Sequence, residues 1–315
     1  MELRPLGRSG LKVSALALGT MNFGADWHGV GAIDDAAASS LLDLALERGV
    51  NLLDTADIYG RGAAEEMLGR LLRGGRREKF LVATKVLGRM RPDDAATGGL
   101  SARWIAQALD DSLRRLRTDH VDLYMPHGWD PAVPLDETLE ALDRAVRAGK
   151  VRVLGCSNFS GEQLERSLEA SRRSRFEFDQ VQYSLVSRFP EADLVPVARR
   201  AGVSLLAWSP LAGGLLTGKY GTPGVPGRRA APDAFPFVAP AAAQAAVAVL
   251  RRVAELEGVT PAQAALGWVL SKPFVAAAVV GARTTDQLGE ALGARRLSAR
   301  GMEFLDRASA VAGAS

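Results

Sequence analysis

Four polar residues stand at, or just after, the ends of three consecutive apolar runs in the sequence. Asp54 and Tyr59 lie in "NLLDTADIYG" (51–60), Lys85 ends "FLVATK", and His127 ends "VDLYMPH". Each of them alone has an ordinary structural explanation, since a lysine at a strand end usually extends its charge into solvent and a lone histidine is more often a structural group than a catalyst. Four such residues on consecutive runs indicate a site, because independent accidents would not gather them there.

Together these residue types could protonate a carbonyl oxygen. A tyrosine with an ordinary pKa of about 10 is a poor proton donor at neutral pH. Lys85 beside the phenol would lower the pKa of Tyr59 by stabilising tyrosinate, and Asp54 would keep the lysine charged and in place. His127 could hydrogen-bond and orient the substrate oxygen. Since none of the four is an obvious nucleophile and Cys156 has no basic partner next to it, we expect the carbon to be attacked by a hydride from a cofactor.

Eight short apolar runs predict the strands that would carry these residues. Each is rich in leucine or β-branched residues and bounded by turn residues. The predicted strands are residues 15–20, 51–56, 80–86, 121–127, 151–158, 179–184, 203–210 and 276–282.

Helical patterns alternate with the predicted strands. In "SARWIAQALDDSLRRLR" (101–117) Ser101 is the expected N-cap, and Gly149 fits the C-terminal cap of the pattern over 135–150. Eight strands alternating with helices imply parallel pairing through right-handed crossovers. We therefore predict an α/β fold with one domain over residues 1–315, a closed (β/α)₈ TIM barrel. An open doubly wound sheet is the alternative, disfavoured because no G-x-G-x-x-G follows the first strand.

Two segments fall outside this alternation. The runs 1–6 and 11–15, joined by a turn at 7–10, predict a small β-hairpin. The Gly- and Pro-rich stretch 218–237 is predicted to form a flap rather than a helix.

Composition narrows the class of protein. With 47% hydrophobic residues, the 315-residue chain can bury a large core, and its net charge of +3 gives no reason to expect nucleic acid as a partner. Its single cysteine excludes a disulfide framework and a cysteine-based metal cluster, and we expect no metal site. The sequence shows no signal-peptide region and no apolar run of about 18 residues, so we expect a soluble cytoplasmic protein without a membrane partner.

The chain resembles the aldo-keto reductase superfamily over nearly its full length. The matching segments, in chain order, are "LALGTMNFG", "NLLDTADIYG", "VATKV", "VDLYMPHGWDP", "GKVRVLGCSNFS", "QVQYSL", "WSPLAGGLLTGKY", "TPAQAALGWVL" and "VVGARTTDQL". Any one of them is a modest signal, but so many in order make the resemblance specific. It implies a barrel with the hairpin across its bottom and NADPH-dependent reduction of a small carbonyl substrate.

The resemblance also implies roles for individual residues. Tyr59 would be the general acid, tuned by Lys85 and Asp54. His127 would orient the carbonyl. The resemblance also places Asp54 in the cofactor site. There it implies that Ser157, Asn158 and Gln180 hold the nicotinamide carboxamide and that the nicotinamide ring stacks on Trp208.

The rest of the implied NADPH/NADP⁺ site lies on three further segments. The pyrophosphate loop corresponds to Ser209, Leu211, Gly213 and Lys219, positions beside the cofactor to Thr20 and Met21, and a flap arginine to Arg229. The segment for adenosine and its 2′-phosphate corresponds to Gly281, Arg283, Gln287 and Glu290. An arginine near a helix start suits a phosphate, which favours NADPH over NADH. Two positions depart from the pattern of many relatives: Ala291 stands where they carry asparagine, and Gly281 where they carry lysine.

The substrate stays open at this level. Loops at 22–35, 88–100 and 127–134 would wall its pocket, where Trp27 and Trp129 could provide flat apolar surfaces. A second function is also possible for such a chain: a redox-sensing regulatory subunit that binds the nicotinamide cofactor with little turnover. A third, a barrel lyase or isomerase with Lys85 as a Schiff base, is disfavoured by the nicotinamide-site matches. Oligomeric state cannot be derived from the sequence.

Overall fold

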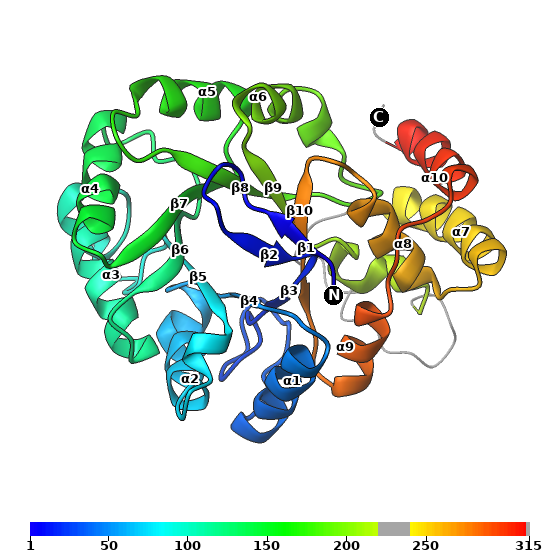
Figure 1. The fold of residues 1–315 in the computed structure, drawn as a ribbon, viewed down its shortest axis with the longest axis horizontal. Coiled ribbons are helices and arrows are strands. Elements are labelled where there is room, and N and C mark those ends of the chain that lie inside the picture. Colours follow the sequence, from blue (N-terminus) through cyan, green and yellow to red (C-terminus); the bar gives the residue numbers. More distant parts are fainter. Residues whose placement is uncertain (220–239, 313–315) are drawn as a thin grey trace.

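The computed structural model describes residues 1–219 and 240–312, in which eight parallel strands close into a barrel surrounded by helices (Figure 1). The order around the barrel follows the chain, with the last strand pairing with the first. The predicted (β/α)₈ fold is therefore confirmed. The barrel strands are β3 (Leu16–Gly19), β4 (Leu52–Asp54), β5 (Leu81–Val86), β6 (Val121–Pro126), β7 (Val151–Ser157), β8 (Phe176–Gln182), β9 (Ser204–Trp208) and β10 (Val275–Gly281).

The helices lie outside the strands. They are α1 (Asp35–Glu47), α2 (Ala63–Leu71), α3 (Ala102–Leu116), α4 (Leu135–Arg147), α5 (Gly161–Ala170), α6 (Leu194–Ala201), α7 (Pro240–Glu257), α8 (Pro261–Leu270), α9 (Thr285–Leu292) and α10 (Ala299–Ala312). Short 3₁₀ turns are η1 (Tyr59–Gly62), η2 (Arg77–Lys79), η3 (Ala95–Thr97), η4 (Phe189–Glu191) and η5 (Ala212–Thr217). Most of the predicted flap at 218–237, including Arg229, lies outside the described residues.

Local signals in the sequence place several helix ends. The Ser101 hydroxyl accepts a hydrogen bond from the Trp104 amide at 3.2 Å, as an N-cap does, and Gly149 adopts a left-handed φ of 73° just after α4. Strand β8 begins three residues before its predicted start at 179. Glu177 interrupts the apolar run there, and its carboxylate accepts a hydrogen bond from the Arg8 amide at 2.7 Å.

The N-terminal hairpin closes the bottom of the barrel. Its strands β1 (Leu3–Pro5) and β2 (Lys12–Ser14) pair antiparallel and cross the front of the barrel in Figure 1. The Gly7 amide at its turn donates to the Ser204 hydroxyl at the start of β9, at 2.9 Å. A Cβ on Gly7 would come within 2.3 Å of the Glu177 carbonyl oxygen, so only glycine fits this close approach.

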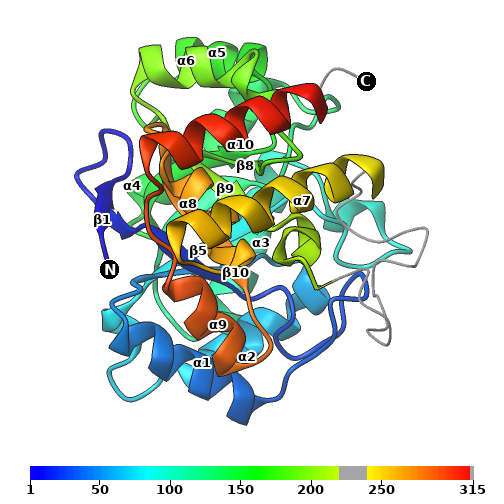
Figure 2. The same cartoon turned by 90° about the vertical axis from the view of Figure 1, so that its right-hand side faces the viewer.

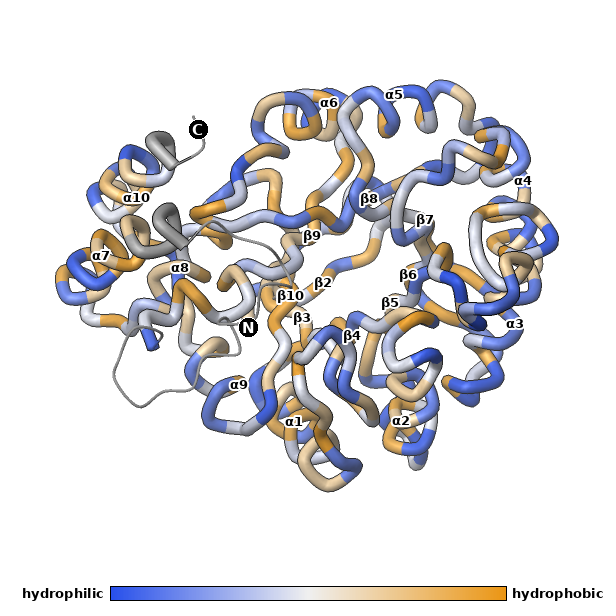
Figure 3. The backbone as a smooth tube through the Cα atoms, turned by 180° about the vertical axis from the view of Figure 1, so that it is seen from behind, coloured by the Kyte–Doolittle hydropathy of each residue, from blue (hydrophilic) through white to orange (hydrophobic). Residues whose placement is uncertain are grey.

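The barrel interior is filled by side chains rather than open. Leu6 and Val13 of the hairpin are fully buried and join a cluster formed by inward-facing strand residues, among them Phe178. A Cβ on Gly155 of β7 would lie 2.3 Å from the Phe178 ring, so this glycine makes room for the aromatic side chain. A second, larger core lies between the strands and the helices. In Figure 3, accordingly, the helices α1 and α2 alternate between hydrophobic and hydrophilic stretches.

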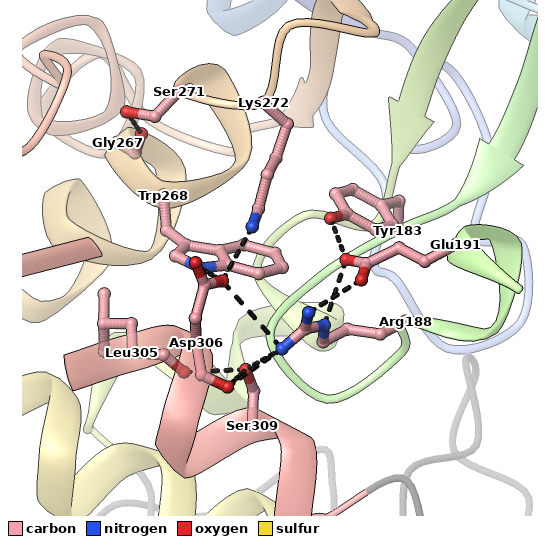
Figure 4. A network of polar contacts seen from close by, with 10 residues as sticks. All are labelled: Tyr183, Arg188, Glu191, Gly267, Trp268, Ser271, Lys272, Leu305, Asp306 and Ser309. Atoms are coloured by element: carbon pink, nitrogen blue, oxygen red, sulfur yellow. Dashed lines mark hydrogen bonds and ion pairs between the residues drawn. The ribbon is translucent and has the colours of Figure 1, made fainter. Parts of the chain in front are cut away.

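Helices α7, α8 and α10 stack on one side of the barrel (Figure 2). A polar network holds α10 there (Figure 4): Arg188 donates to the Asp306 carbonyl at 3.0 Å and the Ser309 hydroxyl at 2.8 Å. Asp306 also accepts from the Trp268 indole at 2.8 Å. The network therefore ties the C-terminal helix to α8 and to the segment after β8.

Candidate active site

The four residues singled out in the sequence converge at the carboxyl ends of β4, β5 and β6. The Lys85 ammonium donates to Asp54 Oδ2 at 2.8 Å, to the Thr55 carbonyl at 2.7 Å and to the Tyr59 hydroxyl at 3.2 Å. The rings of Tyr59 and His127 meet edge to face with centroids 5.9 Å apart. All three donor positions of the ammonium are thus used, and one of them fixes the phenol oxygen.

The local backbone turns sharply to bring Tyr59 to this point. Strand β4 ends at Asp54, and the Thr55 amide still bonds to the Ala83 carbonyl of the neighbouring strand at 2.9 Å. After the tyrosine, Gly60 and Arg61 both adopt left-handed φ values of 54°. Non-glycine residues such as Arg61 rarely adopt the left-handed region, and those that do are often found in turns at functional sites.

Lys85 is buried together with its counter-ion, with side-chain exposures of 0% and 4% for Lys85 and Asp54. Burial alone would lower the pKa of Lys85, but the charges of Asp54 and Tyr59 outweigh it and the pKa is raised. The Asp54 carboxylate also accepts from Gln180 Nε2 at 2.6 Å. The lysine is therefore held as a cation with its charge directed at the phenol.

The pKa of Tyr59 departs from the sequence-based expectation. Burial raises it, the Lys85 charge lowers it, and the net direction is upward rather than downward. The expectation considered the ammonium and missed the desolvation of the phenol, which is partly buried at the cavity wall. Tyr59 is consequently a protonated donor, with a cation in place to stabilise the anion that forms when the proton leaves.

His127 is a neutral imidazole. Burial and, secondarily, the nearby Lys85 charge lower its pKa to about 3. Its backbone amide bonds to the Val86 carbonyl at 2.8 Å, which fixes the residue just beyond β6. A neutral ring suits a hydrogen-bonding role toward a carbonyl oxygen better than an ionic one.

A cavity of about 970 Å³ opens at this end of the barrel. Asp54, Tyr59 and His127 line it. Lys85 is fully buried and does not line the cavity, but its ammonium contacts the Tyr59 hydroxyl. The predicted cofactor residues in the described ranges also line it: Thr20, Met21, Ser157, Asn158, Gln180, Trp208, Ser209, Leu211, Gly213, Lys219, Gly281, Arg283, Gln287 and Glu290. The structure therefore brings together residues from almost the whole length of the chain.

Asn158 connects several of these lining residues. Its side-chain amide donates to the His127 carbonyl at 3.0 Å, and its Oδ1 accepts from the Trp208 indole at 2.8 Å. Its backbone amide donates to the Gln180 carbonyl at 3.0 Å. Next to it, the Ser157 hydroxyl donates to the same carbonyl at 2.7 Å. The segment after β7 is thus joined to the exits of β6, β8 and β9.

The segment after β9 exposes backbone to the cavity. Four residues of this segment have left-handed φ values: Ser209, Ala212, Gly213 and Gly214. The Gly213 amide donates to the Ser209 hydroxyl at 3.0 Å, which closes the turn. The two glycines allow a ligand to approach the backbone closely, and Lys219 adds a positive charge that suits an anion.

The third part of the cavity wall is the start of α9. Thr284 caps this helix by accepting from the Gln287 amide at 3.3 Å, and Gln287 Oε1 accepts from the Arg283 amide at 3.0 Å. Gly281 is open on the cavity side, since a Cβ there would meet only the Gly19 carbonyl at 3.9 Å. An exposed arginine beside a helix N-terminus is a suitable site for a phosphate.

The predicted substrate wall is only partly where it was expected. Trp27 lines the cavity, with the Arg61 guanidinium 5.8 Å from its ring centroid. Trp129 is not among the described lining residues, because its ring packs edge-on against Phe159, with centroids 5.3 Å apart, under Arg166. Trp129 therefore lies outside the lining of this cavity, since the sequence indicates its loop but not the direction of its ring.

Sequence reasoning missed other lining residues. Asn22 lines the cavity and donates to the Ala282 carbonyl at 2.9 Å, which ties the first loop to β10. His28, Val30 and Ile58 also line it. The sequence contains only indirect signals for these residues: His28 and Val30 lie in a loop that was expected to wall the pocket, and Ile58 stands next to Tyr59.

Two buried carboxyl groups were also not foreseen. Asp57 and Asp179 are fully buried, and none of their carboxylate oxygens has a hydrogen-bond partner among the described residues. The sequence around Asp57 is typical of a turn. Burial, and secondarily the charge of Glu65, raises its pKa well above the usual value.

No helix in the described part of the chain is long and apolar enough to cross a membrane.

Comparisons with known proteins agree with this architecture. The model of the "Aldo/keto reductase family" matches residues 15–310. The "Uncharacterized oxidoreductase YrpG" of Bacillus subtilis is 40% identical, over 95% of this chain and 92% of that protein. "Protein tas" of Escherichia coli is 37% identical over 91% of both chains. A "Probable voltage-gated potassium channel subunit beta" of Arabidopsis thaliana is 34% identical over 92% of this chain and 90% of its own. This chain belongs to the aldo/keto reductase family.

Proposed function

We propose that this protein is an NADPH-dependent reductase that converts an aldehyde or ketone to the alcohol, with Tyr59 as the general acid. The observation that carries the proposal is the Lys85 ammonium, which contacts both Asp54, at 2.8 Å, and the Tyr59 hydroxyl, at 3.2 Å, at the closed end of a large cavity. Family membership and a relative named as an oxidoreductase support a redox reaction.

The cavity wall fits a nicotinamide dinucleotide. The glycines at 213 and 214 carry no side chain and so leave room for a pyrophosphate close to the backbone beside Lys219, and Trp208 offers an aromatic face. Ser157, Asn158 and Gln180 would hold the carboxamide. When bound there, the reduced cofactor would supply the hydride that the carbonyl carbon accepts.

The chain's own residues supply the proton and orient the oxygen. The neutral His127 would hydrogen-bond the carbonyl oxygen while the Tyr59 O–H donates its proton to it. Lys85 stabilises the resulting phenolate, and Asp54 holds the ammonium in position. The cation behind the phenol offsets the raised pKa of Tyr59 at the moment when negative charge develops.

We further propose a preference for NADPH over NADH. Arg283 and Lys219 line the cavity, and Arg283 lies next to the N-terminus of α9, where a 2′-phosphate would be favoured by both the guanidinium and the helix. Trp27 supports a substrate with an apolar or planar face. A cytoplasmic location and a small-molecule partner remain predictions from the sequence.

The test is oxidation of NADPH with a panel of aromatic, aliphatic and sugar aldehydes, for the wild type and Tyr59→Phe. We expect turnover in the wild type and a loss of at least about a hundredfold in the variant, because the proton donor is removed. NADPH binding should be nearly equal in both proteins. Equal turnover in the two proteins would refute the role of Tyr59.

A regulatory role is the second candidate. The observation that favours it is the similarity to proteins named as potassium channel beta subunits, at 32–34% identity. Saturable NADPH binding by the wild type with no turnover on any aldehyde of the panel would make this the leading function. Turnover that depends on Tyr59 would favour the reductase.

A further inference from the structure

Asp179 is a buried acid that the proposed chemistry does not use. Its side chain is fully buried in β8, and neither carboxylate oxygen has a hydrogen-bond partner among the described residues. An unpaired buried carboxyl group destabilises a fold, and this one is retained directly beside Gln180, which lines the cofactor cavity. A destabilising group at such a place is typical of a functional constraint.

The carboxyl group faces the segment that follows β7. Cys156 of β7 is its register partner across the ladder. The backbone amides of Asn158 and Phe159 lie near the carboxylate and favour its charged form, although neither makes a hydrogen bond to it. The Asn158 amide is used by the Gln180 carbonyl, at 3.0 Å, so the Phe159 amide is the group in this turn on which the charge of Asp179 can act.

The turn held in this way is connected to the active site. Asn158 has a left-handed φ of 58°, a conformation that asparagine adopts more readily than most other non-glycine residues. In this conformation its side chain joins the His127 carbonyl, at 3.0 Å, to the Trp208 indole, at 2.8 Å. Relaxing the turn would move the groups proposed to hold the nicotinamide ring.

We propose that Asp179 is a positioning residue for the nicotinamide end of the cofactor site: its ionised carboxylate attracts the Phe159 amide and so keeps the neighbouring Asn158 in its bridging conformation. The inference rests on the proposed binding of a nicotinamide cofactor. It assigns to Asp179 no contact with cofactor or substrate.

The protonation state of Asp179 is poised to change near neutral pH. Burial raises its pKa to about 7, against the opposing effects of the Cys156 thiol and the two amides, and the Asp193 carboxylate at the start of α6 raises it further. If the ionised form binds cofactor better, binding must in turn lower the pKa of Asp179. Cofactor binding near that pH then releases a fraction of a proton.

The experiment measures proton release on cofactor binding by titration calorimetry in two buffers of different ionisation enthalpy. NADH is the probe, because it lacks the 2′-phosphate, whose own ionisation would also release or take up protons. Wild type is compared with Asp179→Asn, which keeps the shape and removes the titration. Asp57→Asn is the matched control, since it neutralises another fully buried, unpartnered carboxyl group that lies elsewhere in the barrel.

We expect proton release in the wild type and in Asp57→Asn that peaks just below pH 7 and vanishes well above it, and none in Asp179→Asn. The affinity of the wild type for NADH should fall as the pH is lowered through that range, by up to about tenfold per pH unit, while Asp179→Asn shows the weaker affinity throughout. Equal proton release in Asp179→Asn and the wild type would overturn the inference while leaving cofactor binding intact. Failure of the wild type to bind either NADH or NADPH would overturn the proposed function, and the inference with it.

Stability gives a second readout that separates positioning from simple structural damage. Because the pKa of Asp179 is raised on folding, the group destabilises the protein progressively from about pH 4 to about pH 7. Asp179→Asn should therefore unfold at a higher temperature than the wild type at neutral pH, although it binds cofactor more weakly. A variant that loses both stability and affinity would contradict the inference. Should the variant yield no folded protein, the wild type still decides, because release that does not change across this pH range excludes Asp179 as its source.

Discussion

The buried ion pair of Lys85 and Asp54 allows a quantitative test of how the active site is held together. Lys85→Met keeps the length of the side chain and removes its charge. The Asp54 carboxylate, 4% exposed, would then remain buried without its cation, and the Thr55 carbonyl would lose a donor at 2.7 Å. Breaking a buried pair on one side costs about 3–5 kcal/mol. The hydrogen bond from Gln180 to Asp54 at 2.6 Å remains and favours the lower part of this range.

The double variant Lys85→Met/Asp54→Asn should be more stable than Lys85→Met alone. The second substitution removes the uncompensated charge and leaves a neutral amide that can still bond to Gln180. We expect it to recover about 2 kcal/mol relative to Lys85→Met. The coupling energy is this recovery plus the cost of Asp54→Asn alone, and it should fall in the range found for residues in direct contact. Both proteins should lack turnover, because Tyr59 loses the cation that stabilises its anion.

The assay is urea-induced unfolding of the two single variants and the double variant, followed by far-ultraviolet circular dichroism. The pair Arg70 and Asp35 is the matched control, since its charged atoms are also 2.8 Å apart but its side chains are 42% and 47% exposed. The same cycle there, Arg70→Met and Asp35→Asn, should give a coupling of about 1 kcal/mol or less.

Destabilisations of the single variants that simply add in the double variant would refute the assigned coupling.

Four further outcomes are expected. Arg283→Ala should weaken NADPH binding by about tenfold or more and NADH binding little, because only the phosphate loses a charged partner; equal losses in fluorescence titrations would contradict this. Asp57→Asn should raise the unfolding temperature increasingly above about pH 4, since the raised pKa of this buried acid makes its ionisation destabilising; thermal scans across pH that run parallel for both proteins would count against it. Gly155→Ala should cost about 1–3 kcal/mol, because its Cβ would lie 2.3 Å from the Phe178 ring; chemical unfolding of this variant with and without Phe178→Leu should show partial recovery in the pair. His127→Asn should lower kcat by about two orders of magnitude without changing its pH profile between about pH 5 and 8, because the pKa of His127 is about 3; loss of an ionisation from the profile would show that the histidine titrates in turnover.

Much of the fold could be predicted from local patterns. The eight apolar runs, the N-cap at Ser101 and the left-handed glycine after α4 are confirmed because each depends on residues close in sequence. The catalytic constellation could also be predicted, since parallel strands all end at the same mouth of a barrel and Asp54, Lys85 and His127 each stand at such an end. The start of β8 could not, because Glu177 breaks the pattern for a contact with the distant hairpin.

Local patterns in the sequence specify the barrel, its hairpin and the residue types that meet at the mouth. The degree to which each group is desolvated, and the direction of each ring, depend on tertiary contacts. Desolvation reverses the expected direction of the Tyr59 pKa and keeps His127 neutral, and Asp57 and Asp179 are fully buried acids. Trp129 faces Phe159 instead of the cavity. Solvent exposure and side-chain direction depend on contacts between segments far apart in the chain, and no local pattern specifies these contacts.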